Sequence, residues 1–105
     1  MKDEASWSHL DMICKGDTSC LEKFKKVLQV ELPEERLQLV TAISNNDLSE
    51  AALIVHKTKH KFSLMGMTSA YNYAMVYEEA LKNNDSTGHE LFLTYLKELY
   101  DFLGL

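Results

Sequence analysis

The chain has few residues that interrupt regular structure, since its 105 residues include one proline and four glycines. This scarcity favours helices over a many-turned sheet, and the alternation of β-branched and polar residues that is typical of strands is absent. The two cysteines, Cys14 and Cys20, are too few for a disulfide framework, and their spacing fits no common zinc motif. We therefore expect both thiols to be reduced and packed.

The chain also lacks an excess of positive charge and long apolar runs. Its net charge is −5, which disfavours nucleic acid and anionic membranes as main partners, because binding to phosphate groups needs a basic surface. No segment approaches about 18 uninterrupted apolar residues, and the N-terminus has no apolar signal region. With 46% apolar and 26% charged residues, we expect one globular domain over residues 1–105, outside the membrane and in the cytoplasm.

Amphipathic segments separated by short breaks fill the first half of the chain. A short helix is expected over residues 4–14, and Asp17 or Thr18 is a suitable N-cap for a second helix. Leu32-Pro33 predicts an interruption, with Pro33 at the first position of a third helix. The residues expected to face inward on that third helix are Leu37, Val40 and Ile43.

Polar breaks also delimit the second half. The run 45–47, Asn-Asn-Asp, ends the third predicted helix, and Asp47 with Glu50 forms a capping box for a helix over residues 48–65. A further helix is expected over residues 68–81.

The last helix is expected to follow a second capping box, Thr87-x-x-Glu90, after a loop over residues 83–86. Short connections between amphipathic helices favour antiparallel neighbours. The predicted fold is therefore all-α, an antiparallel up-down four-helix bundle with one or two additional N-terminal helices.

The stretch over residues 56–66 is the most informative part of the sequence. On a helical wheel of about 100° per residue with His56 at zero, the apolar stripe centres on roughly −140°. His56 therefore points to solvent, and Lys59 and His60 lie within about 60° of it, one turn along the helix. The stripe itself contains Ala51, Ile54, Val55, Thr58, Phe62 and Met65.

An exposed imidazole with a lysine one turn away suits a transiently phosphorylated nucleophile. The ring nitrogen attacks, and the Lys59 ammonium offsets the charge of the phosphoryl group. Lys61, about 140° from His56 on the wheel, is not expected to reach such a group, and Lys57 is marginal at about 100°. Apolar residues placed around His56 on the exposed side predict a docking surface that excludes water during transfer: Ala52, Leu53 and Met67.

The pattern of His56, Lys59 at +3 and Gly66 at +10, on a helix after an Asn-Asp break, resembles the histidine-containing phosphotransfer (HPt) domain family. Small Ser63 and apolar Met65 stand where the family carries similar residues. The resemblance extends roughly from Leu10 to Leu103 in the order and length of the segments. Its one marked departure is His60, at a position where the family usually has glycine.

The resemblance implies that His56 takes a phosphoryl group from an aspartyl phosphate on one receiver domain and passes it to an aspartate on another, with Lys59 stabilising the charge. It implies partners among the receiver domains of a hybrid sensor kinase and/or a response regulator. Docking residues are expected to be Ala52, Leu53, His60, Ser63 and Met67, with a structural role for Gly66. Since the family's glycine is thought to let a partner's active site come close, His60 is expected to constrain docking.

The same resemblance implies a monomeric carrier that acts stoichiometrically and is not an enzyme. It implies no cofactor on this chain, because the acidic pocket and the Mg²⁺ ion would belong to the receiver domain.

Two other functions fit parts of the sequence. A helical adaptor could dock partners without phosphorylation, and His60 at the family's glycine position favours it. His56 and His60 also form an H-x-x-x-H pair, the helical spacing that can bind zinc. Against a zinc site, no glutamate lies between them and Lys57, Lys59 and Lys61 raise the local positive potential, so we expect no bound metal.

Overall fold

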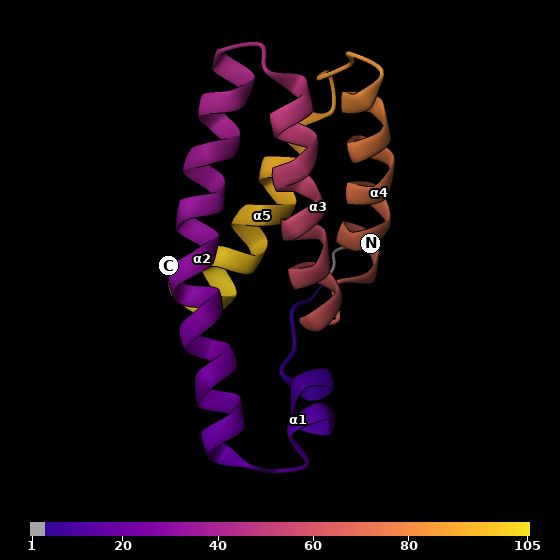
Figure 1. The fold of residues 1–105 in the computed structure, drawn as a ribbon. Coiled ribbons are helices and arrows are strands. Elements are labelled where there is room, and N and C mark those ends of the chain that lie inside the picture. Colours follow the sequence, from indigo (N-terminus) through magenta and orange to yellow (C-terminus); the bar gives the residue numbers. More distant parts are fainter. Residues whose placement is uncertain (1–3) are drawn as a thin grey trace.

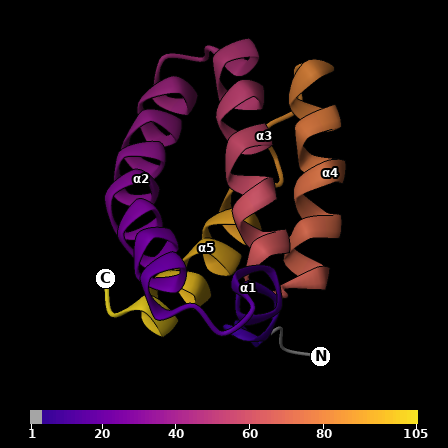
Figure 2. The same cartoon turned by 60° about the horizontal axis from the view of Figure 1, so that its bottom comes forward.

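The computed structural model describes residues 4–105, and within that part it contains five helices and no strand. α2, α3 and α4 form a row side by side, α5 crosses behind them obliquely, and α1 lies near the start of α2 (Figures 1 and 2). The predicted all-α class is confirmed, while the first three residues of the predicted domain lie outside the described residues. The helices are α1 Ser8–Cys14, α2 Thr18–Ser44, α3 Leu48–Leu64, α4 Thr68–Lys82 and α5 His89–Leu103.

None of the helices in residues 4–105 is both long enough and apolar enough to span a membrane.

Helix α2 runs without a break through Pro33, so the predicted interruption into two helices is wrong. Proline inside a helix costs about 3 kcal/mol because it removes one backbone hydrogen bond and clashes with the preceding turn. One buried stripe crosses Pro33, and fully burying each leucine contributes about 1.5–3 kcal/mol, which offsets that cost. The stripe consists of Leu28, Leu32, Glu35, Leu39 and Ala42.

The stripe also fixes which side of α2 faces the core. It places Leu37 in solvent and leaves Val40 and Ile43 only partly buried, so the predicted inward face of this segment is corrected for Leu37. The stripe that begins at Leu28 continues in phase through Pro33, and it directs Glu35 and Leu39 rather than Leu37 toward the core.

A residue with a positive φ follows each of α2, α3 and α4. The polar breaks over residues 45–47 and 83–86 predict the ends of α2 and α4. Asn46, Gly66 and Asn84 have φ of 55°, 73° and 63°. After α3, the Gly66 amide donates to the Ser63 carbonyl and the Met67 amide donates to the Phe62 carbonyl, at 3.1 and 3.0 Å. This pair of bonds is the Schellman motif, in which glycine takes the left-handed position without strain. Gly66 thus ends α3 and turns the chain back into α4.

The predicted N-caps of α2 and α3 are confirmed, whereas that of α5 is wrong. At α3 the reciprocal half of the predicted capping box does not form, because the Asp47 amide donates to the Ala42 carbonyl and not to Glu50. The side chain of Asp17 accepts hydrogen bonds from the Ser19 and Cys20 amides, and Asp47 accepts one from the Glu50 amide. At α5 the N-cap is Gly88.

The reason lies in the preceding loop, where Asp85 accepts hydrogen bonds from both the amide and the hydroxyl of Thr87. Thr87 is therefore occupied before the helix begins, and the predicted capping box with Glu90 does not form.

Cys14 and Cys20 form a disulfide between the end of α1 and the first turn of α2, so the prediction of reduced thiols is wrong. Their Cα atoms are 5.6 Å apart, within the range that a disulfide spans. The turn that includes Gly16, with φ of 80°, reverses the chain between the two helices and brings the cysteines together. A count of cysteines could not show this pairing.

Candidate functional site

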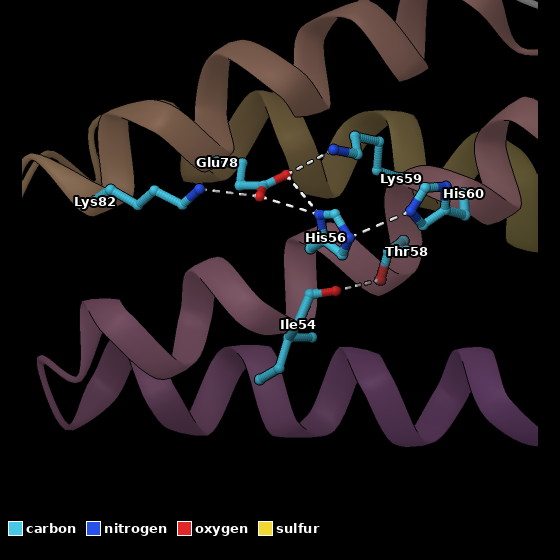
Figure 3. A network of polar contacts seen from close by, with 7 residues as sticks. All are labelled: Ile54, His56, Thr58, Lys59, His60, Glu78 and Lys82. Carbon is cyan, nitrogen blue, oxygen red and sulfur yellow. Dashed lines mark hydrogen bonds and ion pairs between the residues drawn. The ribbon is translucent and has the colours of Figure 1, made fainter.

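The carboxylate of Glu78, on α4, joins the polar residues around His56 (Figure 3). Its two oxygens lie 3.3 and 3.1 Å from Nδ1 of His56. Lys59 Nζ lies 2.9 Å from Oε1 and Lys82 Nζ lies 3.4 Å from Oε2. The site therefore combines two residues of α3 with two of α4, and we refer to these four residues as the Glu78 cluster.

The turn at Gly66 places α4 beside α3 and so builds this cluster. Within α3, His56 lies opposite the buried Ile54 and Val55, as the wheel predicts. Lys59 lies at the edge of the contact between the two helices, where its side chain is largely buried against Glu78. His56 remains half-exposed, so the cluster is buried on its lysine–glutamate side and open on its imidazole side.

Glu78 is ionised at neutral pH. Burial alone raises the pKa of Glu78, but the hydrogen bond and charge of Lys59, followed by those of His56, outweigh burial and lower the pKa below its ordinary value. An ionised carboxylate can accept hydrogen bonds but cannot donate them, so the hydrogen between the two groups belongs to Nδ1 of His56. In the neutral ring this leaves the lone pair on Nε2.

The Nε2 atom of His56 is directed away from Glu78 and lies 3.3 Å from Nε2 of His60 (Figure 3). The two rings are nearly perpendicular, with an interplanar angle of 86°. When both rings are neutral, His60 must donate its Nε2 hydrogen to the His56 lone pair. His60 thus contacts the atom that the sequence marks as the nucleophile.

The expected docking residues divide into exposed and buried ones. Leu53, His60 and Ser63 are exposed, whereas Ala52 and Met67 are buried, which corrects the prediction for those two. Ala52 is covered because α4 packs along that side of α3. Met67 is buried because α3 ends before it, so a wheel continued past Gly66 gives the wrong direction.

A shallow hollow lies beside His56 and retains part of the predicted surface. It is lined by Ser49, Ala52, Leu53, His56, Glu78 and Lys82.

The other lysines of the motif behave as the wheel predicts. Lys61 faces α2, where its Nζ lies 2.6 Å from Glu35 Oε2 and 3.0 Å from Glu31 Oε1. Burial lowers the pKa of Lys61, but the hydrogen bonds and charges of Glu35 and Glu31 raise it overall. Lys57 is exposed and lines a hollow on the α2 side with these glutamates.

Sequence reasoning missed Glu78 and Lys82. A usable signal was present, because Glu78 lies four residues after Ala74 and three before Leu81, within the apolar stripe of α4. A charged residue at such a position needs a partner from another element. The sequence does not say which element supplies it.

Within residues 4–105, no group of three or more His, Cys, Asp or Glu side chains is arranged to hold a metal ion.

Comparison with known families gives a match that includes the whole site. The family model described as "Hpt domain" matches residues 23–103, which is most of the chain and includes His56, Lys59 and Glu78. Comparisons with curated proteins and with solved structures each found no match. The match begins inside α2, so α1 and the disulfide precede it. On this match, the chain belongs to the Hpt domain family.

Proposed function

We propose that His56 is the phosphoryl acceptor of this domain and carries the group between aspartates of receiver domains. The Hpt domain is a histidine phosphotransfer module of phosphorelays, so the family supports the general activity. The observation that supports His56 in particular is its hydrogen bond through Nδ1 to Glu78, on a half-exposed ring. That bond leaves the lone pair of the neutral ring on the outward-facing Nε2, which acts as the nucleophile once the hydrogen bond from His60 is broken.

The transfer step follows from this tautomer. The Nε2 lone pair of His56 attacks the phosphorus of an aspartyl phosphate, forming an N–P bond while the P–O bond to the aspartate breaks. The aspartate leaves as a carboxylate with the electron pair of that bond. The proton on Nδ1 stays in place, so the ring gains positive charge, which the ionised Glu78 offsets.

Lys59 is proposed to stabilise the charge of the phosphoryl group. Its Nζ is bound to Oε1 of Glu78 in the unphosphorylated protein, so it is already held beside His56. Glu78 holds this ammonium on the Nδ1 side of His56, so the Lys59 side chain leaves Glu78 and extends toward Nε2 to stabilise the charge of the group there. Lys82 contacts the other oxygen of the same carboxylate and is given no direct role toward the phosphoryl group.

The proposed partners are the receiver domains of a hybrid sensor kinase and/or a response regulator. Leu53, His60 and Ser63 are exposed around His56, and the edge of Ala52 reaches the hollow beside it. Mg²⁺ belongs to the receiver in this proposal, and this chain acts stoichiometrically as a monomer without a cofactor.

We further propose that α2 to α5 form the family's four-helix bundle with α1 as the additional N-terminal helix, the whole chain acting as one unit. The cytoplasm is the proposed compartment. The Cys14–Cys20 disulfide stands against that location, because disulfides are rare in the cytosol. Alkylation and mass spectrometry of the protein from rapidly quenched cells would measure its thiol state.

The decisive experiment is phosphoryl transfer from a panel of phosphorylated receiver domains to the wild type, to His56→Gln and to His9→Gln. His9 is an exposed histidine on α1 and provides the matched control. We expect an acid-labile, alkali-stable label on the wild type and on His9→Gln, and complete loss of label in His56→Gln. Equal labelling of His56→Gln would overturn the assignment.

A helical adaptor remains the second candidate, supported by the His60 ring over Nε2 of His56. It becomes the better account if receivers, acetyl phosphate and phosphoramidate all fail to label the wild type.

A further inference from the structure

The contact between His56 and His60 brings two metal-binding nitrogens together. They lie one helical turn apart on α3, with the Nε2 atoms 3.3 Å from each other. Both side chains are exposed, so an ion can reach this point from solvent. Figure 3 shows the two rings approaching each other from one side of the helix.

The separation of the two nitrogens suits a tetrahedral ion. Zn²⁺ binds imidazole nitrogen at about 2.0–2.1 Å, and two nitrogens at that distance and 3.3 Å apart subtend about 107° at the ion. The tetrahedral angle is about 109°. To bind one ion, His60 loses the hydrogen on Nε2 to solvent and takes one up on Nδ1, and each ring turns until its Nε2 lone pair points at the ion.

Glu78 adds the outer contact that metal-binding histidines usually have. A histidine ligand commonly donates its second ring N–H to a carboxylate, which fixes the tautomer and makes the binding nitrogen more basic. Nδ1 of His56 has such a contact with Glu78 at 3.1 Å. The orientation that prepares Nε2 as a nucleophile also prepares it as a ligand.

We propose, against the expectation from the sequence, that His56 and His60 chelate a divalent transition-metal ion, such as Zn²⁺, through their two Nε2 atoms. The contact between the two nitrogens and the Glu78 carboxylate on Nδ1 of His56 are the observations that the sequence lacks. Water or a partner completes the coordination, because no third His, Cys, Asp or Glu of residues 4–105 joins the pair. Lys59 and Lys82 together outweigh the single charge of Glu78, so affinity is lower than that of a closed structural zinc site.

The site has a regulatory consequence that rests on the proposed function. The same Nε2 lone pair of His56 cannot bind a metal ion and a phosphoryl group at once. Bound metal therefore inhibits phosphorylation, and phosphorylated protein does not bind the ion at this pair.

The test is a calorimetric titration of the tag-free chain with ZnCl₂, without reductant so that Cys14 and Cys20 stay bonded. We expect one ion per chain for the wild type and for His9→Gln, and loss of that binding in His60→Gln and His56→Gln. Glu78→Gln should lower the affinity about tenfold, as expected for an outer contact. Circular dichroism confirms that each variant folds.

Absence of binding to the wild type, or equal binding to His60→Gln, overturns the metal site. These results do not depend on phosphorylation, so they are distinguishable from a failure of the proposed function.

A second arm measures labelling by phosphorylated receiver domains with the receiver's Mg²⁺ held constant. Zn²⁺ should slow labelling of the wild type and leave labelling of His60→Gln unchanged. Equal slowing of both proteins would overturn the proposed inhibition through His56 and His60, since the ion would then act at another site.

Discussion

Two lysine–glutamate pairs connect α3 to its neighbours, and the other partners of the two glutamates differ. Lys61 pairs with Glu35 of α2, with 11% and 9% of the two side chains exposed, and Lys59 pairs with Glu78 of α4, with 12% and 11% exposed. Burial of the pairs is thus nearly equal. The remaining partners differ, because Glu35 also accepts from the buried Thr58 hydroxyl, whereas Glu78 binds His56, which is 51% exposed.

This difference shows that burial of an ion pair does not by itself indicate a functional site. Around Glu35 the carboxylate has buried partners in Lys61 and Thr58, so the group can hold α3 against α2 but presents little to solvent. Around Glu78 one lysine holds the carboxylate while the histidine extends outward. The exposed third partner distinguishes the Glu78 cluster.

Removing Glu35 should have the largest effect on stability. Glu35→Ala leaves Lys61 without its closest partner and removes the acceptor that Thr58 uses on Glu35. We expect the free energy of unfolding to fall by about 3 kcal/mol. This is the low end for a broken buried pair, because Lys61 keeps its contact with Glu31. Urea denaturation measures the loss, with the exposed neighbour Glu34→Ala as control. Labelling of His56 in the folded protein should stay within about twofold of the wild type; a large loss would remove the distinction between the two pairs.

Glu78→Gln should affect transfer more than stability. The amide oxygen can still accept from Nδ1 of His56, but the negative charge that offsets the developing ring charge is lost. We expect labelling to slow about tenfold, equivalent to about 1.4 kcal/mol, with about 1 kcal/mol lost in stability. Single-turnover transfer measures the rate, and the exposed neighbour Glu79→Gln is the matched control. An unchanged rate would show that Glu78 has only a structural role.

Acid should remove the contribution of Glu78 to stability. Because the folded pKa of Glu78 is lowered, its contribution is fully present above the ordinary glutamate pKa of about 4.3 and is lost as the pH falls through the folded value. The difference in unfolding free energy between wild type and Glu78→Gln should therefore shrink as the pH falls from about 6 to about 3. Urea denaturation across that range tests it, and a constant difference would contradict the lowered pKa.

Lys82→Ala should have the smallest effect. Its Nζ is 3.4 Å from Glu78 and its side chain is 55% exposed, so the pair is an ordinary surface contact one turn along α4. We expect the free energy of unfolding to fall by at most about 0.5 kcal/mol and the rate of phosphoryl transfer to change less than twofold. The same denaturation and transfer measurements apply. A change as large as that of Glu78→Gln would mean that Lys82 contributes directly to the phosphoryl site.

The sequence by itself determined the features that depend on neighbouring residues. Caps at Asp17 and Asp47 follow from hydrogen bonds within about one helical turn, and the polar breaks over residues 45–47 and 83–86 mark the ends of α2 and α4. The outward direction of His56 follows from the period of α3. These predictions are confirmed because the physical cause of each feature lies within its own segment of the chain.

Only the tertiary structure decided the features that depend on distant residues. Burial of a common stripe carries α2 through Pro33, and the turn after α3 sends Met67 into the core. Glu78 reaches His56 across 22 positions of sequence, because α4 returns beside α3. Helical periodicity gives the direction of a side chain on its own helix, while its partner depends on how the helices pack.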